Sequence, residues 1–324
     1  MGFGSFAGKT AVVTGGGSGI GRSLGVQLTA EGCSIAVCDL NLDDLAETRA
    51  LAEAGAPADT RVSTHICDVS DESQVVRFRN EVIGAHGETI ELLINNAGIA
   101  GGNSFVTDTR EDWERTFAVN FWGVYYCSRA FLPHLIAADA ARIVNVSSIN
   151  AVWASGGWGR PSTAYGASKF AVKGLSEALI DDFRANAPNV EVSVVMPGRV
   201  RTGILTNSRR YFGVAGPESL SDNELLQARV GLVKIGLAVA EDASPDEIRG
   251  ILQRVEDWVR DSPPLGVDEA VTIMLDGIRA GRWRIIVGDD ARELDEAVRA
   301  DPDAAYDHEG VGIVARPPQS LLYP

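Results

Sequence analysis

Short apolar segments alternate with helical patterns through the first part of this chain, and no other feature constrains the fold as strongly. The apolar segments are almost continuously hydrophobic, as expected for strands buried on both faces. They lie at residues 9–14, 34–38, 61–66, 90–94, 141–146 and 190–195. Helical patterns separate them at 23–30, 41–54, 71–85, 112–136 and 164–185. This alternation predicts an α/β fold with a doubly wound parallel sheet and helices on both faces.

The remainder of the chain does not continue the alternation. Residues 205–264 are mostly helical or loop, and we expect them to form a lid over the substrate. A helix over 266–279 and a last strand over 283–287 follow, which brings the sheet to about seven strands. The final residues are acidic and then contain prolines. We therefore predict one domain over residues 1–288, which includes the lid insertion, and a C-terminal tail over 289–324.

The formal charge of −15 at pH 7 argues against nucleic acid or an anionic membrane as a partner, because both require a basic surface. The first residues show no basic segment followed by a long apolar run, so we expect neither a signal peptide nor a membrane span. The four histidines lack metal-ligand spacing, and we predict no metal site. The cysteines form no Cys-x-x-Cys pair and are expected to be buried, reduced thiols, which fits a cytoplasmic location. They are Cys33, Cys38, Cys67 and Cys127.

A glycine-rich turn joins the first predicted strand to the first predicted helix. Its pattern is Thr14-Gly15-x-x-x-Gly19-Ile20-Gly21, with Ser18 before the second of these glycines. Glycines let the backbone turn tightly and approach a pyrophosphate, and the helix N-terminus then offers free N–H groups and the positive end of its dipole. Glycines also form ordinary turns, but a glycine turn between a strand and a helix favours a dinucleotide site.

Asp39 ends the second predicted strand, 24 residues after Gly15. A carboxylate at this position accepts hydrogen bonds from the adenosine ribose and repels a 2′-phosphate. Neither Ser18 nor Leu40 is basic, so neither would attract that phosphate. We therefore expect NAD rather than NADP as the cofactor. In the alternative interpretation, Asp39 is only a turn or cap residue for the helix predicted at 41–54.

Tyr165 and Lys169 are four residues apart in a predicted helix, so their side chains share one face. In an arbitrary protein this spacing is usually a solvated helix face. A free tyrosine has a pKa of about 10 and is a poor base at neutral pH, whereas a nearby ammonium and a positive nicotinamide would stabilise its phenolate. Ser148, at the end of the fifth predicted strand, is the candidate partner for a substrate oxygen. Its competitors are Ser147 and, less favoured, Ser155, Ser162 and Thr163.

These motifs together resemble the shorter, single-domain subfamily of the short-chain dehydrogenase/reductase family, over residues 7–204 and again near 282–288. Each motif is weak alone, but their order and their places at strand ends are specific. The resemblance implies a Rossmann-type fold, a nicotinamide dinucleotide and oxidoreductase activity. Besides the glycine turn and the Tyr–Lys pair, the matching residues are Asp68-Val69, Asn95-Asn96-Ala97-Gly98, Asn120, Ser148 and Pro197-Gly198-x-Val200-x-Thr202.

At the adenosine end, the resemblance implies that Asp68 bonds the adenine amino group and that Val69 packs beside the ring. Asn95, Asn96, Ala97 and Gly98 would fix the fourth strand and border the adenosine. For the asparagines of this motif, turn chemistry is the simpler alternative. The other expected cofactor-binding residues are Gly15, Ser18, Gly19, Ile20, Asp39, Tyr165 and Lys169.

At the nicotinamide end, the resemblance implies that Pro197 and Gly198 border the ring, that Val200 belongs to the same cofactor-binding motif, and that Thr202 bonds the carboxamide. Asn120 lies inside a predicted helix, where asparagine is normally unfavourable. In the family this residue distorts the helix and holds a water that relays protons to the lysine. A simple kink is the alternative.

We therefore expect an NAD-dependent oxidoreductase that interconverts a secondary alcohol and a ketone on a largely apolar small molecule. The catalytic residues would be Asn120, Ser148, Tyr165 and Lys169, with Tyr165 as general acid/base. The alternative is an NAD-binding sensor without turnover, although such proteins usually lack the Tyr or the Lys. An extended epimerase or dehydratase fits neither the glycine spacing nor the Asn-Asn-Ala-Gly motif. On family grounds we expect a homodimer or homotetramer.

Three regions depart from the family pattern. Ser148 and Tyr165 are separated by 16 residues, more than is usual, and the additional ones fall at 152–161. We interpret this loop, which contains Trp153 and Trp158, as a mobile wall of the substrate pocket; the alternative is a surface loop whose indoles pack for stability. We expect the C-terminal tail to wrap a neighbouring subunit. The residues expected to line the lid are Phe212, Leu225, Leu226, Val230 and Leu232.

Overall fold

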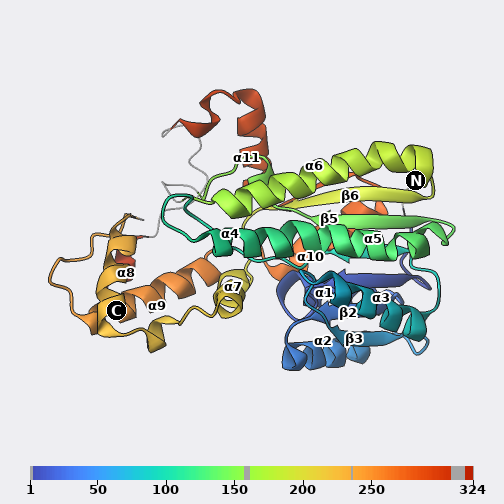
Figure 1. Ribbon diagram of the computed structural model, residues 1–324, viewed down its shortest axis with the longest axis horizontal. Coiled ribbons are helices and arrows are strands. Elements are labelled where there is room, and N and C mark those ends of the chain that lie inside the picture. Colours follow the sequence, from blue (N-terminus) through green and yellow to red (C-terminus); the bar gives the residue numbers. More distant parts are fainter. Residues whose placement is uncertain (1–2, 157–160, 235, 308–317, 324) are drawn as a thin grey trace.

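The computed structural model describes residues 3–156, 161–234, 236–307 and 318–323. Its centre is a seven-stranded parallel sheet with the order β3-β2-β1-β4-β5-β6-β7 (Figure 1), as predicted. The strand order reverses between β1 and β4, and doubly wound sheets bind ligands at the carboxyl ends of the strands at such a point. The strands are β1 Thr10–Thr14, β2 Ser34–Asp39, β3 Val62–Ile66, β4 Leu92–Asn95, β5 Ala141–Val146, β6 Val190–Pro197 and β7 Arg284–Val287.

Helices cover both faces of the sheet, and each face has its own hydrophobic core (Figure 1). Successive strand residues point to opposite faces, so Val13 belongs to one core and Val12 to the other. The helices on the Val13 face are α1 Gly19–Ala30, α2 Leu42–Gly55 and α10 Val267–Arg279. Those on the Val12 face are α3 Glu72–His86, α5 Gly123–Ile136 and α6 Thr163–Asn186. This arrangement confirms the predicted doubly wound α/β fold.

The long helix predicted over 112–136 is present but interrupted. Helix α4 (Arg110–Phe117) continues into a π-helical turn over Ala118–Trp122, and α5 follows at once. Asn120 lies in the middle of this turn and is fully buried. Single π turns inside α-helices occur frequently at functional sites. The distortion expected at Asn120 is therefore confirmed.

The helices between β6 and α10 form a helical lobe beside the sheet domain (Figure 1). It contains α7 Ile204–Phe212, α8 Asp222–Lys234 and α9 Pro245–Asp261, and α9 starts with the capping box of Ser244 and Glu247. The lobe has a hydrophobic cluster of its own. Leu225 and Leu232 belong to that cluster. The prediction that they line the lid is therefore wrong, because their side chains pack in the interior of the lobe.

The other residues expected to line the lid have different surroundings. Leu226 and Val230 are about half exposed, on the outer side of α8. Phe212 is the residue of this set that reaches the sheet domain, where it packs at the edge of the core on the Val12 face. Helix α7 therefore contributes the side chain of Phe212 to the core of the sheet domain.

The C-terminal segment is more ordered than the predicted tail. Helix α11 (Asp289–Ala300) begins immediately after β7 and is followed by a short 3-10 turn over Ala304–Tyr306. Farther on, Arg254 of α9 donates hydrogen bonds to the carbonyl oxygens of Leu321 and Leu322. The described parts of this segment thus pack on two different elements of their own chain.

All four cysteines are buried and free, as predicted. Burial raises the pKa of the Cys33 thiol to about 12, because an isolated thiolate loses its hydration there. Such thiols stay protonated and serve as small apolar residues. Across the described ranges, no helix has both the length and the hydropathy needed to cross a bilayer.

Candidate active site

Ser148, Tyr165 and Lys169 meet beside the end of β5. Tyr165 and Lys169 lie one turn apart on α6, as the sequence predicts, and the Lys169 ammonium is 5.6 Å from the centroid of the Tyr165 ring. Lys169 is 4% exposed, and its Nζ donates to the carbonyl oxygen of Val146 at 3.1 Å. Ser148 follows this strand and forms a hydrogen bond with the Tyr165 hydroxyl. A phenol, a hydroxyl and a buried ammonium therefore share one corner of the site.

Burial shifts the pKa values of Tyr165 and Lys169 in opposite directions. Burial raises the pKa of Tyr165, because the phenolate would lose water, and the hydrogen bond from Ser148 partly opposes this rise. Burial lowers the pKa of Lys169 to about 8, because an ammonium also loses water. Without a cofactor, the phenol is therefore a weak acid. A positive nicotinamide near Tyr165 would add the charge that favours the phenolate.

Ser147, the main competitor of Ser148, has a different place. Its hydroxyl is buried and donates to the backbone carbonyl of Lys169 at 2.8 Å, which ties β5 to α6. Thr163 also bonds backbone, at the carbonyl of Gly102 and a distance of 3.2 Å. Of these candidates, the structure brings Ser148 to the phenol. This geometry supports the choice of Ser148 over Ser147.

Asn120 connects three parts of the site. Its Oδ1 accepts from the backbone N–H of Ile99 at 2.8 Å, and its Nδ2 donates to the Ile99 carbonyl at 2.9 Å and to Ser168 Oγ at 3.1 Å. A Cβ at Gly98 would lie 3.3 Å from both Asn120 Oδ1 and Lys169 Nζ. The π turn thus holds an amide next to the lysine, while the same amide fixes the loop after β4.

The glycine turn has the geometry of an anion cradle. Gly15 and Gly19 have positive φ angles of 65° and 51°, a region that favours glycine. A Cβ at Gly21 would lie 2.0 Å from the carbonyl oxygen of Gly15, so the turn and α1 approach too closely for any side chain. Ser18, the N-cap of α1, makes no side-chain cap, and the first turn carries no acidic residue. The turn leads directly into the N-terminus of α1, and free N–H groups at a helix N-terminus are able to bind an anion such as a pyrophosphate.

Asp39 lies at the end of β2 and faces this turn. Its Oδ2 accepts from the N–H of Gly17 at 2.8 Å, and its Oδ1 accepts from the N–H of Leu40 at 2.7 Å. The cap of α2 is Asn41, whose Oδ1 accepts from two N–H groups of the first turn. Asn41 rather than Asp39 therefore caps that helix, whereas Asp39 bonds the glycine turn, as the interpretation of Asp39 as a turn residue expects.

Arg22 is a contact that sequence reasoning missed. Its guanidinium donates to the carbonyl oxygen of Gly17 at 2.6 Å and forms an ion pair with Glu47 at 2.9 Å. From the first turn of α1, Arg22 therefore fixes the glycine turn at Gly17. In the sequence, its position directly after Gly21 pointed to this role, but an arginine there is equally typical of a solvated helix surface.

The adenosine-side residues form two supports at the strand ends. Asp68 Oδ1 accepts from both the N–H and the hydroxyl of Ser70 at 2.9 and 2.6 Å, and Val69 is buried beside it. Asn96 Nδ2 donates to the carbonyl oxygens of Thr14 and Gly15 at 3.0 and 3.1 Å. The N–H of Ala97 donates to Thr14 Oγ1. Asn96 thus performs the turn-fixing role given as its alternative, at the border of the predicted adenosine site.

The nicotinamide-side motif lies against the glycine turn. Pro197 ends β6, and Val200 pairs with Leu265 in an isolated parallel bridge. Thr202 lies 3.6 Å from the position that a Cβ of Gly19 would occupy, which is contact distance. The start of α11 packs against Gly198. The motif therefore joins the end of β6 to the glycine turn before α1.

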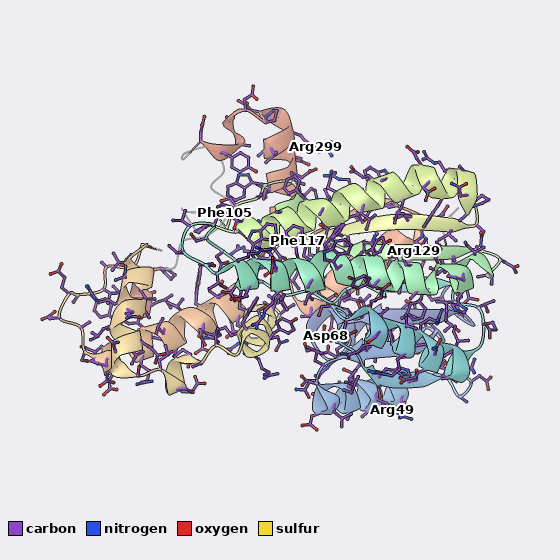
Figure 2. The ribbon with its side chains drawn as sticks, viewed as in Figure 1. Arg49, Asp68, Phe105, Phe117, Arg129 and Arg299 are labelled. Atoms are coloured by element: carbon purple, nitrogen blue, oxygen red, sulfur yellow. The ribbon has the colours of Figure 1, made fainter. Side chains whose placement is uncertain are left out.

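Helix α7 lies between the glycine turn and the Asp68 loop, and its contacts were not predicted. Asn207 Nδ2 donates to Ser18 Oγ at 3.0 Å, and the N–H of Ala100 donates to Ser208 Oγ at 2.8 Å. Burial and the neighbouring Asp68 carboxylate raise the pKa of Tyr211. Figure 2 shows Asp68 on the side of the sheet domain that faces α7. The first helix of the lobe thus borders the adenosine half of the crevice.

The loop at 152–161, before α6, was interpreted either as a mobile wall of the substrate pocket or as a surface loop whose indoles pack for stability. Trp153 is buried against Leu294 and Ala305, so it packs for stability and does not form a mobile wall. Trp158 lies outside the described residues.

Known proteins share this fold and these motifs. The family described as short chain dehydrogenase matches residues 9–211. "Putative oxidoreductase SadH" of Mycobacterium tuberculosis is 40% identical over 205 residues, which cover 63% of this chain and 71% of that protein. Epidermal retinol dehydrogenase 2 of Homo sapiens is 35% identical over 200 residues, which cover 61% of this chain and 62% of that protein.

A solved structure extends the likeness beyond the matched segment. The crystal structure of a short chain dehydrogenase/reductase from Burkholderia phymatum in complex with NAD has a TM-score of 0.72 and 28% sequence identity, and the match covers 92% of this chain and 95% of that one. With the parallel sheet, the glycine turn and the Tyr–Lys pair in their places, these matches give one conclusion. The chain belongs to the short-chain dehydrogenase/reductase family of oxidoreductases, enzymes that act on CH–OH groups with a nicotinamide cofactor.

Proposed function

We propose that this protein is an NAD-dependent oxidoreductase that interconverts a secondary alcohol and a ketone on a largely apolar small molecule, with Tyr165 as general acid/base. The observation that carries this proposal is the shared corner of Ser148, Tyr165 and Lys169. The phenol bonds Ser148, and the Lys169 ammonium lies 5.6 Å from its ring centroid. A Tyr–Lys pair on a solvated helix face would not bury its lysine, whereas Lys169 is buried beside the phenol and donates to a backbone carbonyl.

Each side chain has a separate task in the proposed mechanism. Ser148 donates a hydrogen bond to the substrate oxygen and orients it toward Tyr165. Tyr165 removes the hydroxyl proton during oxidation and returns it during reduction. Lys169 lowers the pKa of the phenol with its positive charge. NAD, when bound, accepts the hydride from the carbinol carbon.

Asn120 completes the proposed proton path. The amide lies next to the Lys169 ammonium across Gly98, although its own hydrogen bonds are made to Ile99 and Ser168. We assign it the role of keeping the π turn open so that a water reaches the lysine from the solvent side. A proton that leaves Tyr165 would then pass through Lys169 and this water.

The preference for NAD over NADP rests on Asp39. The carboxylate faces the glycine turn, where it would accept from ribose hydroxyls and repel a 2′-phosphate. Ser18 and Leu40 offer no positive charge, and the Arg22 guanidinium nearby already pairs with Glu47.

An apolar substrate is supported by the residues above the strand ends. The ring of Phe212 lies 2.3 Å from the position that a Cβ of Gly101 would occupy, so an aromatic ring packs directly on the loop after β4. Trp113 and Phe117 stack on the neighbouring α4, with ring centroids 4.3 Å apart. The retinol dehydrogenase named above is a relative whose name gives an apolar alcohol.

We further propose a homodimer or homotetramer in the cytoplasm. The π turn and helices α5 and α6 carry large apolar side chains that remain partly exposed in the single chain: Trp122 at 45%, Tyr125 at 39% and Phe170 at 39%. Burial of such a surface against a second copy would stabilise an oligomer. Size-exclusion chromatography with light scattering tests this, and a monomer at micromolar concentration would contradict it.

A panel of alcohols separates the proposed enzyme from a non-catalytic NAD sensor. Purified protein is mixed with NAD and, in turn, the secondary alcohols cyclohexanol and menthol and the primary alcohol retinol, and NADH formation is followed by its absorbance. Cyclohexanone, menthone and retinal with NADH test the reverse direction. We expect turnover that favours the bulkier apolar members and NAD over NADP. Tight NADH binding without turnover across the panel in both directions would favour the sensor.

A further inference from the structure

The C-terminal segment contacts the framework of the active site at the turn that follows β6. Asp290, in the first turn of α11, accepts from the backbone N–H of Arg199 at 2.9 Å through Oδ2. A Cβ at the preceding Gly198 would lie 2.2 Å from Asp290 Oδ1. The start of α11 thus fits directly against the predicted nicotinamide wall.

The same segment makes a second contact, with the loop ahead of α6. Trp153 is 7% exposed and packs with Leu294 and Ala305. Its indole N–H donates to the carbonyl oxygen of Ala305 at 2.7 Å. The backbone N–H of Ala154 donates to the hydroxyl oxygen of Tyr306 at 3.0 Å. Two hydrogen bonds and one buried indole therefore hold this loop at Trp153 and Ala154.

Asn150 connects the held loop to Ser148. Its Nδ2 donates to the carbonyl oxygens of Trp153 and Ser155 at 3.1 and 2.7 Å. Its backbone N–H donates to Ser148 Oγ at 3.1 Å, and the Ser148 hydroxyl donates to Asn150 Oδ1 at 3.3 Å. The Asn150 side chain therefore contacts the Trp153 loop through Nδ2 and the Ser148 hydroxyl through Oδ1.

We propose that Asn150 is a positioning residue for the hydroxyl of Ser148, and that the C-terminal segment from Asp289 to Tyr306 sets its place by holding the Trp153 loop. The proposal rests on the catalytic role proposed for Ser148. The N–H of Asn150 polarises Oγ, which makes the hydroxyl a better donor to a substrate oxygen. The long contact to Oδ1 gives the hydroxyl proton a weak partner that a substrate displaces. Without the Oδ1 contact, the Ser148 hydroxyl loses one of the partners that fix its direction.

The pH profile of turnover distinguishes positioning from a merely structural role. The hydrogen bond from Ser148 lowers the pKa of Tyr165, so a misdirected hydroxyl leaves that pKa higher. For Asn150→Ala, loss of one such hydrogen bond predicts a fall in kcat of about 3- to 10-fold with the panel alcohol that is oxidised fastest. The profile of alcohol oxidation should also shift to higher pH, while NADH affinity, measured by fluorescence, stays the same.

Two conservative variants test the C-terminal contacts without removing packing. Trp153→Phe deletes the indole donor, and Tyr306→Phe deletes the oxygen that accepts from Ala154. Their matched controls are Trp283→Phe and Tyr323→Phe, which change the same residue types at sites that are 46% and 71% exposed. Amide hydrogen exchange, followed by mass spectrometry on peptides that cover Asn150 and Ala154, gives a readout independent of turnover. We expect faster exchange at both amides in the two variants and in neither control.

Three results would overturn the proposal. An unchanged kcat and pH profile in Asn150→Ala removes the positioning role. Unchanged hydrogen exchange at the Asn150 amide in both Trp153→Phe and Tyr306→Phe rejects the role of the C-terminal segment. Equally faster exchange in the controls Trp283→Phe and Tyr323→Phe rejects it as well. Tyr165→Phe, assayed in parallel, keeps this separate from the proposed function. Loss of turnover in Tyr165→Phe together with a normal Asn150→Ala rejects only the inference, whereas turnover in Tyr165→Phe rejects the function.

Discussion

Replacement of Lys169 by methionine should abolish turnover and stabilise the fold at the same time. Burial lowers the pKa of Lys169 from 10.5 to about 8. Since tenfold in an acid equilibrium corresponds to about 1.4 kcal/mol, the charged ammonium destabilises the folded state by about 3 kcal/mol at neutral pH. Methionine removes this penalty but leaves the carbonyl of Val146 without its donor, which costs about 1 kcal/mol. The expected net gain in the free energy of unfolding is therefore about 2 kcal/mol.

The gain should depend on pH in a defined direction. Below pH 8 the lysine is charged in both states, and its penalty is complete. Between about 8 and 10.5 the folded protein releases the proton while the unfolded chain keeps it, so the stability of the wild type rises with pH. Urea unfolding at pH 7 and at pH 10 measures both values. The advantage of Lys169→Met should be largest at pH 7 and should shrink at pH 10.

Lys173→Met is the matched control. Lys173 lies one turn farther along α6, is 25% exposed and pairs with Glu177 at 2.9 Å, so its charge is solvated. We expect no stabilisation from its removal. Two results would refute the reasoning that the charge of Lys169 is kept for function at a cost in stability. One is a Lys169→Met protein that is no more stable than the wild type at pH 7. The other is an equal increase in the free energy of unfolding in Lys173→Met.

Three further perturbations follow from the site and its supports. Asp39→Ala should raise the ratio of NADP to NAD efficiency by about tenfold or more, because removal of a repulsive charge a few ångströms from a phosphate is worth ~1–3 kcal/mol; kcat/KM for both cofactors measures this, and an unchanged ratio contradicts the role of Asp39. Gly21→Ala should abolish NADH binding, since its Cβ would lie 2.0 Å from Gly15 O, whereas Gly84→Ala, in open space on α3, should bind NADH normally. Burial lowers the pKa of His86 from 6.5 to about 4, so between these pH values the unfolded chain binds a proton that the folded protein does not bind. The free energy of unfolding should therefore fall by about 3 kcal/mol as the pH drops from 6.5 to 4. His86→Gln should flatten this dependence, and an equally steep loss in that variant would exclude His86 as its source.

The strands and the cofactor crevice could be predicted because their signals are local. Buried parallel strands are continuously apolar, and the glycine turn needs residues adjacent in sequence. The predicted boundaries of β2 and β5 agree with the structure to within a residue. The distortion at Asn120 followed from the family resemblance, since periodicity alone predicts an uninterrupted helix there.

The contacts of α7 and α11 could not be predicted, because they join residues far apart in the chain. Trp153 and Ala305 are 152 residues apart, and Asn207 and Ser18 are 189 apart. No local pattern marks such a pair. Helical periodicity also identifies the apolar face of α8 without saying what covers it, which is why Leu225 was expected at the substrate and lies inside the lobe instead.

The most direct test of the central claim is the turnover of Tyr165→Phe with NAD and the best alcohol of the panel, measured beside its affinity for NADH. The phenylalanine keeps the ring that lies under Lys169 and removes only the hydroxyl that bonds Ser148. We predict that NADH binds as it does to the wild type and that turnover is lost by a factor of about 100 or more, the usual range for a general acid/base. Turnover near the wild-type rate would contradict the assignment of Tyr165 as the proton-transferring group.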